Sequence, residues 1–230
     1  MLRKIKNMLR KTLNDVEGLL ENESGENGLI ESGKPAPYAQ KVDYCEGKVG
    51  LRNLRHEEIA IAQDFLRDRQ TCMYAFGFRL DISESKLQSV YESYNGYISL
   101  QMETFCAILF EGQLAGLMSV EVWDEHKLRL ATLGLYVGSA QMRGRGIGTA
   151  AMTMILRHLF EVLLVDVVEL DTAVYNLPSH RLYKKLGFEQ CSQTDCLSSS
   201  QRARDLEDYA PSDYFRYTKE MWQERRNEPT

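Results

Sequence analysis

Three apolar runs near the middle of the chain constrain its fold more than any other feature. They cover residues 105–111, 113–124 and 128–137, and each has the residue types of a β-strand. The first two are joined by Glu111-Gly112-Gln113, a turn typical of a β-hairpin. Strands joined by such short turns must pair antiparallel, because a parallel neighbour needs a crossover of about a dozen residues. The centre of the chain therefore predicts an antiparallel meander.

Apolar residues on both sides of the meander recur with the spacing of helices as well as of strands. The predicted helices cover residues 56–70, 83–94, 146–163 and 176–186. The further predicted strands cover 49–55, 165–174 and 214–221, with another that opens at Phe188 and a polar connection over 191–213. This order predicts an α/β fold with a mixed, mostly antiparallel central sheet of about seven strands, flanked by helices.

The two ends of the chain are predicted to lie outside the main domain. Residues 2–20 have the pattern of a basic amphipathic helix, and 22–40 are rich in Glu, Gly, Asn, Ser and Pro, which is typical of a linker. Such a helix fits a membrane-surface contact, a subunit contact in a homodimer or a loosely docked extension. We expect a helical extension and linker over 1–46, one main domain over 47–222 and a C-terminal tail over 223–230.

Composition argues against several classes of protein. The net charge is −5, and a cluster of basic residues lies only in the first predicted helix. The rest of the chain therefore has no strong positive field that would favour nucleic acid. No apolar run reaches roughly eighteen residues, so we expect no integral membrane association. Five scattered cysteines and the lack of a signal-peptide pattern favour a reducing, cytoplasmic setting. The histidines have no metal-ligand spacing, so no metal site is expected: His56, His126, His158 and His180.

A glycine-rich segment, Gln141–Thr149, lies between the last meander strand and the next predicted helix. The start of a helix offers backbone N–H groups without partners and the positive end of the helix dipole. Its three glycines, at alternate positions, allow a bulky anion to approach the backbone, and Arg143 and Arg145 add positive charge. The segment predicts a phosphate site.

Neither of two common phosphate-binding motifs fits this segment fully. The Walker pattern is absent, because no Gly-Lys-Ser/Thr ends the loop. The stretch Gly146–Ala151 satisfies G-x-G-x-x-A, and Asp166 or Asp171 follows about twenty residues later, as in dinucleotide-binding proteins. That motif belongs to a parallel βαβ unit, however, whereas this loop follows an antiparallel meander. The motif nevertheless makes an NAD-dependent oxidoreductase one hypothesis for function.

Two motifs together resemble a known family. Arg143-Gly144-Arg145-Gly146-Ile147-Gly148 resembles the acetyl-CoA signature (Gln/Arg-x-x-Gly-x-Gly/Ala) of the GNAT superfamily of N-acetyltransferases. The segment Asn176–Phe188, with Ser179, Tyr183 and Gly187, resembles the second signature of that superfamily. The resemblance covers residues 49–221 and is closest to the branch that holds ribosomal-protein N-terminal and spermidine acetyltransferases. It implies a GNAT-like sheet and acetyl-CoA as co-substrate, so that 47–222 would be an acyl-CoA N-acyltransferase domain.

The resemblance also implies roles for individual residues. In the superfamily the strand before the signature splays from the strand after it, and its backbone contacts the pantetheine arm and the acetyl carbonyl. The implied cofactor-binding residues are Leu135, Tyr136, Val137, Arg143, Gly144, Arg145, Gly146, Ile147, Gly148, Thr149, Asn176 and Ser179. Tyr183 is implied as the general acid for the departing thiolate, although it would also suit a packed helix face. Asn176 can equally serve as a helix cap.

The general base is not fixed by the sequence. Many members of the superfamily carry a glutamate in the strand before the signature, but Leu130–Leu133 contains no carboxylate. Glu121 is the first candidate, Asp171 the second, and a water chain the third. The expected reaction is direct transfer of an acetyl group to a primary amine of a small molecule or a protein N-terminus. The alternative is a non-catalytic GNAT-like module that senses acyl-CoA.

Overall fold

The computed structural model describes residues 42–125, 127–138, 140–197 and 208–227 of the 230-residue chain. The predicted basic helix at 2–20 and the predicted linker at 22–40 lie outside these residues. Among the helices of the described part, none is both long and apolar enough to cross a membrane.

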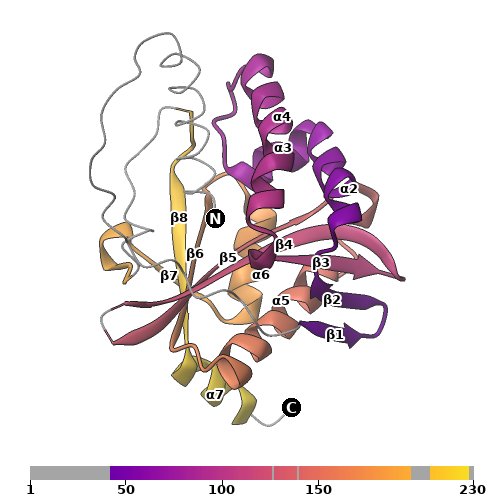
Figure 1. The fold of residues 1–230 in the computed structure, drawn as a ribbon. Helices are drawn as coiled ribbons and strands as arrows, with labels where there is room; N and C mark the ends of the chain where they lie inside the picture. Colours follow the sequence, from indigo (N-terminus) through magenta and orange to yellow (C-terminus); the bar gives the residue numbers. More distant parts are fainter. Residues whose placement is uncertain (1–41, 126, 139, 198–207, 228–230) are drawn as a thin grey trace, which may run out of the picture.

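The described residues form one eight-stranded sheet with the order β1-β2-β3-β4-β5-β6-β8-β7 (Figure 1). All neighbouring strands pair antiparallel except β5 and β6, which are parallel. The predicted mixed, mostly antiparallel sheet is therefore confirmed, with one strand more than expected. The bounds are β1 Asp43–Glu46, β2 Val49–Asn53, β3 Phe105–Phe110, β4 Gln113–Glu125, β5 Leu128–Val137, β6 Val167–Ala173, β7 Glu189–Cys191 and β8 Ser212–Thr218.

The extra strand, β1, lies at the edge of the sheet and starts four residues before the predicted domain boundary at 47. Its residues Asp43–Glu46 are mostly exposed and pair only with β2 through a turn at Gly47, which has a positive φ of 59°. A short edge strand buries little, so its sequence lacks the alternation that marks a half-buried strand.

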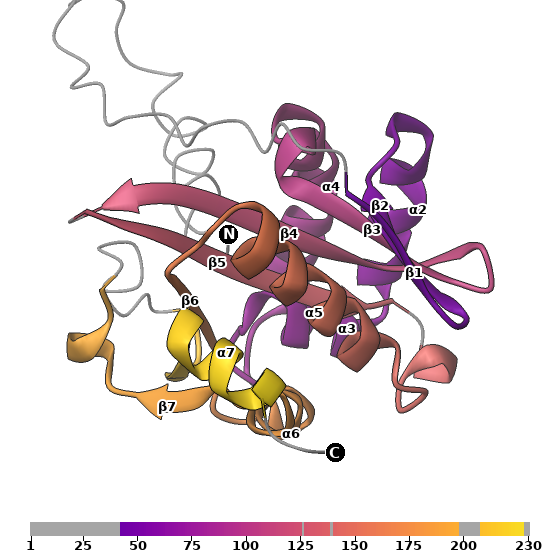
Figure 2. The same ribbon diagram turned by 90° about the horizontal axis from the view of Figure 1, so that it is seen from below.

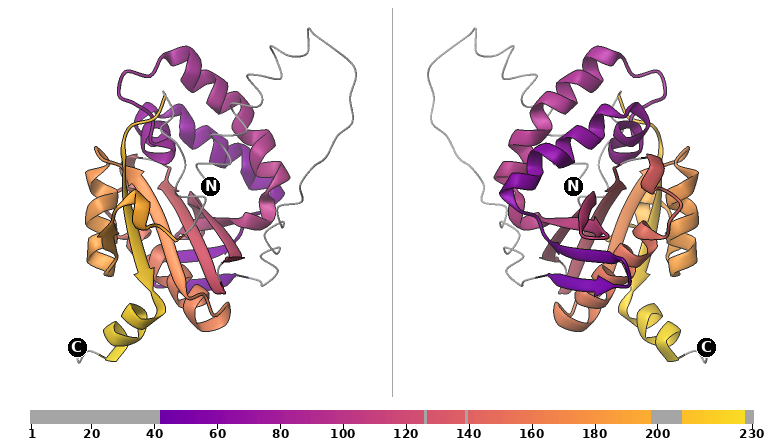
Figure 3. Two further views of the ribbon diagram at one scale, coloured as in Figure 1. Left: turned by 90° about the vertical axis from the view of Figure 1, so that its left-hand side faces the viewer. Right: turned by 90° about the vertical axis from the view of Figure 1, so that its right-hand side faces the viewer.

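Helices cover both faces of the sheet (Figures 2 and 3). The helices α2, α3 and α4 pack on one face, around Leu117 and Tyr136, and α5 and α6 pack on the other, around Met118 and Val120. The bounds are α2 Ile59–Asp64, α3 Arg69–Phe76, α4 Glu84–Leu100, α5 Ile147–Arg157, α6 Leu177–Leu186 and α7 Lys219–Asn227. Short helical turns are at His56–Glu58, Phe65–Arg67, Met102–Thr104, Ala140–Met142 and Gln193–Asp195, and a π-helical turn at His158–Val162 extends α5.

The predicted meander is confirmed by β3, β4 and β5. At the first turn Glu111 and Gly112 both have positive φ, 51° and 81°, which joins Phe110 directly to Gln113 in the ladder. Two central residues with positive φ suit the right-handed twist of the paired strands. Further along β4, a Cβ on Gly116 would lie 2.2 Å from the carbonyl oxygen of Tyr136, so only glycine fits this close approach.

The helix predicted over 83–94 forms as α4 and continues to Leu100. Two other predicted elements differ more from the structure. The helix predicted over 56–70 is interrupted at Asp68, which adopts an extended conformation and caps the separate helix α3 through a hydrogen bond from Thr71 N. The strand predicted over 214–221 ends at Thr218, and α7 then continues beyond the predicted domain end at 222 into the predicted tail. The residues around the break, Arg67–Thr71, are all polar, and such a run fits the exposed face of a continuous helix as well as an interruption.

The sheet divides between β5 and β6. Only Leu130–Thr132 pair with Val167–Glu169, whereas β5 continues to Val137 and β6 to Ala173 without pairing to each other. The other edge of β5 stays paired with β4 as far as Val137. The two parallel strands therefore diverge after Thr132, and a wedge opens between the second half of β5 and the second half of β6.

Candidate active site

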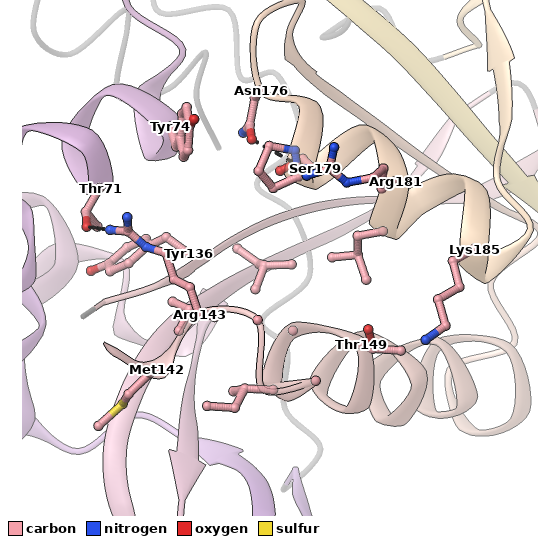
Figure 4. A pocket seen from close by; sticks show the side chains of 18 residues that line it. Thr71, Tyr74, Tyr136, Met142, Arg143, Thr149, Asn176, Ser179, Arg181 and Lys185 are labelled. Carbon is pink, nitrogen blue, oxygen red and sulfur yellow. Dashed lines mark hydrogen bonds between the residues drawn. The ribbon is translucent and has the colours of Figure 1, made fainter. Parts of the chain in front are cut away.

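A cavity of about 540 Å³ lies in this wedge (Figure 4). Its floor is the end of β5, and its walls are the glycine-rich loop with the first turn of α5, the start of α6, and Thr71 and Tyr74 from α3. A volume of this size suits a small-molecule or cofactor ligand. Of the residues predicted to bind cofactor, eleven line the cavity: Leu135, Tyr136, Val137, Arg143, Gly144, Gly146, Ile147, Gly148, Thr149, Asn176 and Ser179.

The first turn of α5 faces the cavity with little side-chain cover. Gly146 is the N-cap residue, with φ at 79°, and it contributes no side-chain hydrogen bond. The N–H of Ala150 donates to the carbonyl of Gly146 at 3.0 Å, so the N–H groups of the three residues before it precede the helical ladder. A Cβ on Gly146 would point into open space, whereas a Cβ on Gly148 would touch Leu182 and Leu135. The loop therefore offers backbone donors and a positive dipole end to an anion.

The two arginines of the loop are held by protein partners. The guanidinium of Arg143 donates to Asp68 Oδ2 at 2.7 Å and to Gln70 Oε1 at 2.6 Å, and it also contacts the Thr71 hydroxyl. Arg145 lies over the ring of Phe110, 4.3 Å from its centroid, and does not line the cavity. Arg143 thus ties the loop to α3, and of the predicted cofactor-binding residues Arg145 alone is turned elsewhere.

The Asp68–Thr71–Arg143 network also joins the loop to the end of β5. The Thr71 hydroxyl donates to Asp68 Oδ2 at 2.6 Å and lies 2.9 Å from the carbonyl oxygen of Gly138. Burial alone would raise the pKa of the Asp68 carboxyl, but hydrogen bonds from Thr71 and Arg143 outweigh it and lower that pKa below its ordinary value. Asp68 is therefore a charged carboxylate at neutral pH, which fixes Arg143.

Asn176 is the N-cap residue of α6. Its Oδ1 accepts from the N–H of Ser179 at 3.4 Å, and its Nδ2 donates to Thr172 Oγ1 at 3.1 Å. The side chain is 3% exposed, and Pro178 occupies the first turn, where a missing N–H costs nothing. The structure thus shows the capping role, and a contact with the pantetheine arm stays a prediction.

Tyr183 and Asp171 lie together at a small hollow that adjoins the main cavity. The two spaces share Tyr74, Leu135, Asn176 and Ser179. Tyr183 is 5% exposed and packs against Phe188 and Phe215. Burial raises the pKa of its phenol well above the ordinary value, and the charge of Asp171 raises that pKa further. The phenol is therefore protonated across the physiological range and can act only as a proton donor there.

Glu121, the first candidate for the base, lies elsewhere. It is directly opposite Thr132 in the ladder, on the face of the sheet covered by α4. Burial raises the pKa of Tyr97 on α4, and the nearby charge of Glu121 raises that pKa further. It lines neither the cavity nor the hollow. The structure brings Asp171, the second candidate, to the site; the role of each carboxylate is still a prediction.

Glu169, a buried acid two residues before Asp171, has a structural role. Glu169 is 1% exposed and accepts from Arg216 Nε and Nη2 at 2.9 and 2.7 Å and from the N–H of Leu197 at 2.9 Å. A buried carboxylate needs such partners, because an unpaired charge in the interior is very costly. This ion pair attaches the segment after β7 to the sheet beside the wedge.

Several cavity residues were not predicted from the sequence. On α6, Pro178, Arg181, Leu182 and Lys185 share one face at three- and four-residue spacing, and that period could have identified them once Asn176 was placed. Thr71 and Tyr74 carry no sequence signal, because the break at Asp68 decides where α3 points. Within the described residues, no group of His, Cys, Asp and Glu could hold a metal ion.

Comparison with known proteins places this fold among the acyltransferases. The sequence profile of the Acetyltransferase (GNAT) family matches residues 63–188, which is more than half of the chain. The chain belongs to that family, as its two motifs predicted. No curated protein sequence matches the chain.

Solved structures of this family are similar in fold. Mycobacterium smegmatis RimJ in complex with CoA-disulfide is 21% identical with a TM-score of 0.57, over 75% of this chain and 82% of that one. The aminoglycoside acetyltransferase AAC(6')-Ib with coenzyme A is 19% identical with a TM-score of 0.56, over 78% and 99%. RimL, a ribosomal L7/L12 alpha-N-protein acetyltransferase with coenzyme A, is 13% identical with a TM-score of 0.56, over 78% and 98%. At these identities the likeness shows the fold.

The Asp68–Arg143 contact predicts a pH-dependent contribution to stability. Because the folded-state pKa of Asp68 is lowered from 3.8, its contribution is present above that value and is lost as the pH falls through the folded pKa. Asp68→Asn should lower the free energy of unfolding by about 0.5–1 kcal/mol at pH 7, since the pair is partly exposed. Urea unfolding should show that this difference shrinks as the pH falls below 3.8.

Asp64→Asn is the matched control, because Asp64 pairs with Arg67 in a mostly exposed contact. It should change stability less at pH 7. Equal stability of Asp68→Asn and the unaltered protein at pH 7 would show that the network does not hold α3 to the loop.

Proposed function

We propose that this protein transfers an acetyl group from acetyl-CoA to an amine, as an N-acetyltransferase. The observation that carries the proposal is the single wedge between β5 and β6. One side of it offers a helix N-terminus with open glycines, and the adjoining hollow holds a protonated phenol and a carboxylate. The family of the chain and its CoA-bound structural neighbours support the same reaction.

In this proposal different elements of the cavity bind different parts of acetyl-CoA. The first turn of α5 receives the pyrophosphate, because its N–H groups and dipole favour an anion. The unpaired edge of β5 around Leu135–Val137 holds the extended pantetheine arm and offers N–H donors to the thioester carbonyl. As the carbonyl carbon becomes tetrahedral, those donors stabilise the negative charge on its oxygen. Asn176 lies at the start of α6 on the opposite side of the wedge.

Two side chains would then manage the protons. The amine nitrogen must lose a proton to attack the carbonyl, and the sulfur must gain one when the C–S bond breaks. Tyr183 donates the proton to the sulfur, since its raised pKa keeps it protonated. Asp171 receives the amine proton, directly or through water, because it is the carboxylate that lines the hollow. Glu121, which lies on β4 opposite Thr132, is the alternative proton acceptor.

The proposed acceptor of the acetyl group is an amine. The similar structures include a protein alpha-N-acetyltransferase and an aminoglycoside acetyltransferase. A protein N-terminus and a small-molecule amine are both proposed acceptors here.

The five cysteines fit a reducing cytoplasmic setting, since those of the described part are free thiols.

A free-thiol assay with acetyl-CoA tests the function. The protein should release CoA in the presence of at least one amine from a panel of peptides with free N-termini, polyamines and aminoglycosides. Gly148→Leu is the control, because its side chain would fill the space between Leu182 and Leu135 and block the cavity. Tight acetyl-CoA binding by calorimetry without turnover on any amine would favour an acyl-CoA sensor. Binding of NAD and not of CoA would favour an oxidoreductase.

Tyr183→Phe should separate chemistry from binding. We expect kcat to fall by about a hundredfold or more, within the range of general acid catalysis, with acetyl-CoA affinity unchanged. Tyr217→Phe is the matched control, because Tyr217 is buried in the same aromatic cluster but lines neither space. Stopped-flow or steady-state kinetics with a fixed amine would measure both. Unaltered kcat for Tyr183→Phe would remove Tyr183 from the mechanism.

Asp171→Asn and Glu121→Gln distinguish the two proton acceptors. If Asp171 receives the proton, its variant should lose the acidic limb of the pH profile of kcat/KM and at least tenfold in rate at pH 7. Glu121→Gln should keep both the limb and the rate within about twofold. The reverse pattern would assign the proton to Glu121, and an unchanged profile in both would leave a water chain.

A further inference from the structure

Two cations on α6 line the cavity and have no role in the site described above. Arg181 and Lys185 are one helical turn apart, and both are exposed to the cavity (Figure 4). In the described part of the chain, neither side chain makes an ion pair or a hydrogen bond. Like charges at this spacing repel each other and weaken an isolated helix. Their placement therefore calls for a negative partner.

The other cations near the cavity are already engaged. Arg143 is fixed by Asp68, Gln70 and Thr71, and Arg145 rests on Phe110. The positive charge still available to a ligand therefore comes from α6 and from the first turn of α5. These are two separate sources, on opposite walls of one cavity.

The helix dipole does not explain this arrangement. Lys184 and Lys185 both lie in the last turn of α6, where the dipole favours a cation equally. Only Lys185 lines the cavity, and Arg181 lies in the middle of the helix, beyond the reach of that effect. In Figure 4 the ammonium of Lys185 extends from α6 toward Thr149 on α5. The α6 cations thus face the same space as the predicted pyrophosphate site, from the other side.

We infer that Arg181 and Lys185 form a second anion site, for a phosphomonoester that the ligand carries in addition to its pyrophosphate. This deepens the proposed function and rests on it: in CoA the matching group is the 3′-phosphate of the ribose. A pyrophosphate at α5 and a phosphomonoester at α6 would span the cavity between its two walls. The protein would then discriminate CoA from 3′-dephospho-CoA, which is identical except for that group.

Isothermal titration calorimetry with CoA and with 3′-dephospho-CoA tests this inference. The unaltered protein should bind 3′-dephospho-CoA about tenfold more weakly than CoA. Arg181→Met and Lys185→Met should each weaken CoA binding by about threefold to fivefold, which is the upper range for an exposed ion pair. Neither should change the affinity for 3′-dephospho-CoA, and in the double variant the two ligands should bind equally.

Lys184→Met is the matched control. It removes the same charge from the same helix turn but does not line the cavity, so it should keep the tenfold ratio. Methionine is a good helix former, and an unchanged urea midpoint would verify that each variant folds.

Three outcomes decide the matter. A ratio that falls to one in the double variant and persists in Lys184→Met supports the second anion site. A ratio near one in the unaltered protein, or a ratio that survives in the double variant, overturns it while leaving CoA binding intact. If no protein in the series binds CoA, the proposed function fails and this inference fails with it.

Discussion

The structure depends on one interruption in hydrogen bonding. β5 and β6 share only three residue pairs, Leu130–Thr132 with Val167–Glu169, and then separate. Parallel neighbours need a crossover, and here the crossover is α5, whose N-terminus must lie where β5 ends. The gap between the strands and the donors of the helix are therefore produced by the same connection. A sheet with full pairing here would have no room for the cavity.

The loop keeps its shape through contacts that its own arginines make. Arg143 reaches α3 through Asp68, Gln70 and Thr71, and Arg145 reaches Phe110 at the end of β3. Two positions in the first half of the glycine-rich segment are thus fixed to different parts of the protein before any ligand arrives. Preorganised donors lose less freedom on binding and are more effective than donors that must first be ordered. Both arginines, which the sequence predicts to bind the cofactor, thus also hold the backbone of the loop, and Arg143 lines the cavity as well.

Most of the fold was predictable because local patterns decided it. Alternation and a tight turn identified β3, β4 and β5, and the glycines with the Asn176–Phe188 segment identified both walls of the cavity. The break at Asp68 was not predictable, since the polar run Arg67–Thr71 fits a continuous helix as well as a break, and tertiary contacts of Thr71 and Arg143 stabilise the extended residue. β1 lacked a pattern because it is exposed. Two features depend on how segments far apart in the sequence pack together, which no local pattern encodes. They are the position of each arginine side chain and the placement of Asp171, rather than Glu121, at the hollow beside the cavity.

The order of the strands has a consequence for biosynthesis. β8 lies between β6 and β7 and is the neighbour with which β7 pairs. Until residues 212–218 have left the ribosome, β6 therefore has an open edge and β7 has no partner in the described sheet. An exposed edge of this kind can pair with other chains. The wall of the cavity that carries α6 is thus completed only after β8 has been made, and a chain that stalls before β8 leaves the edge of β6 open to pairing with other chains.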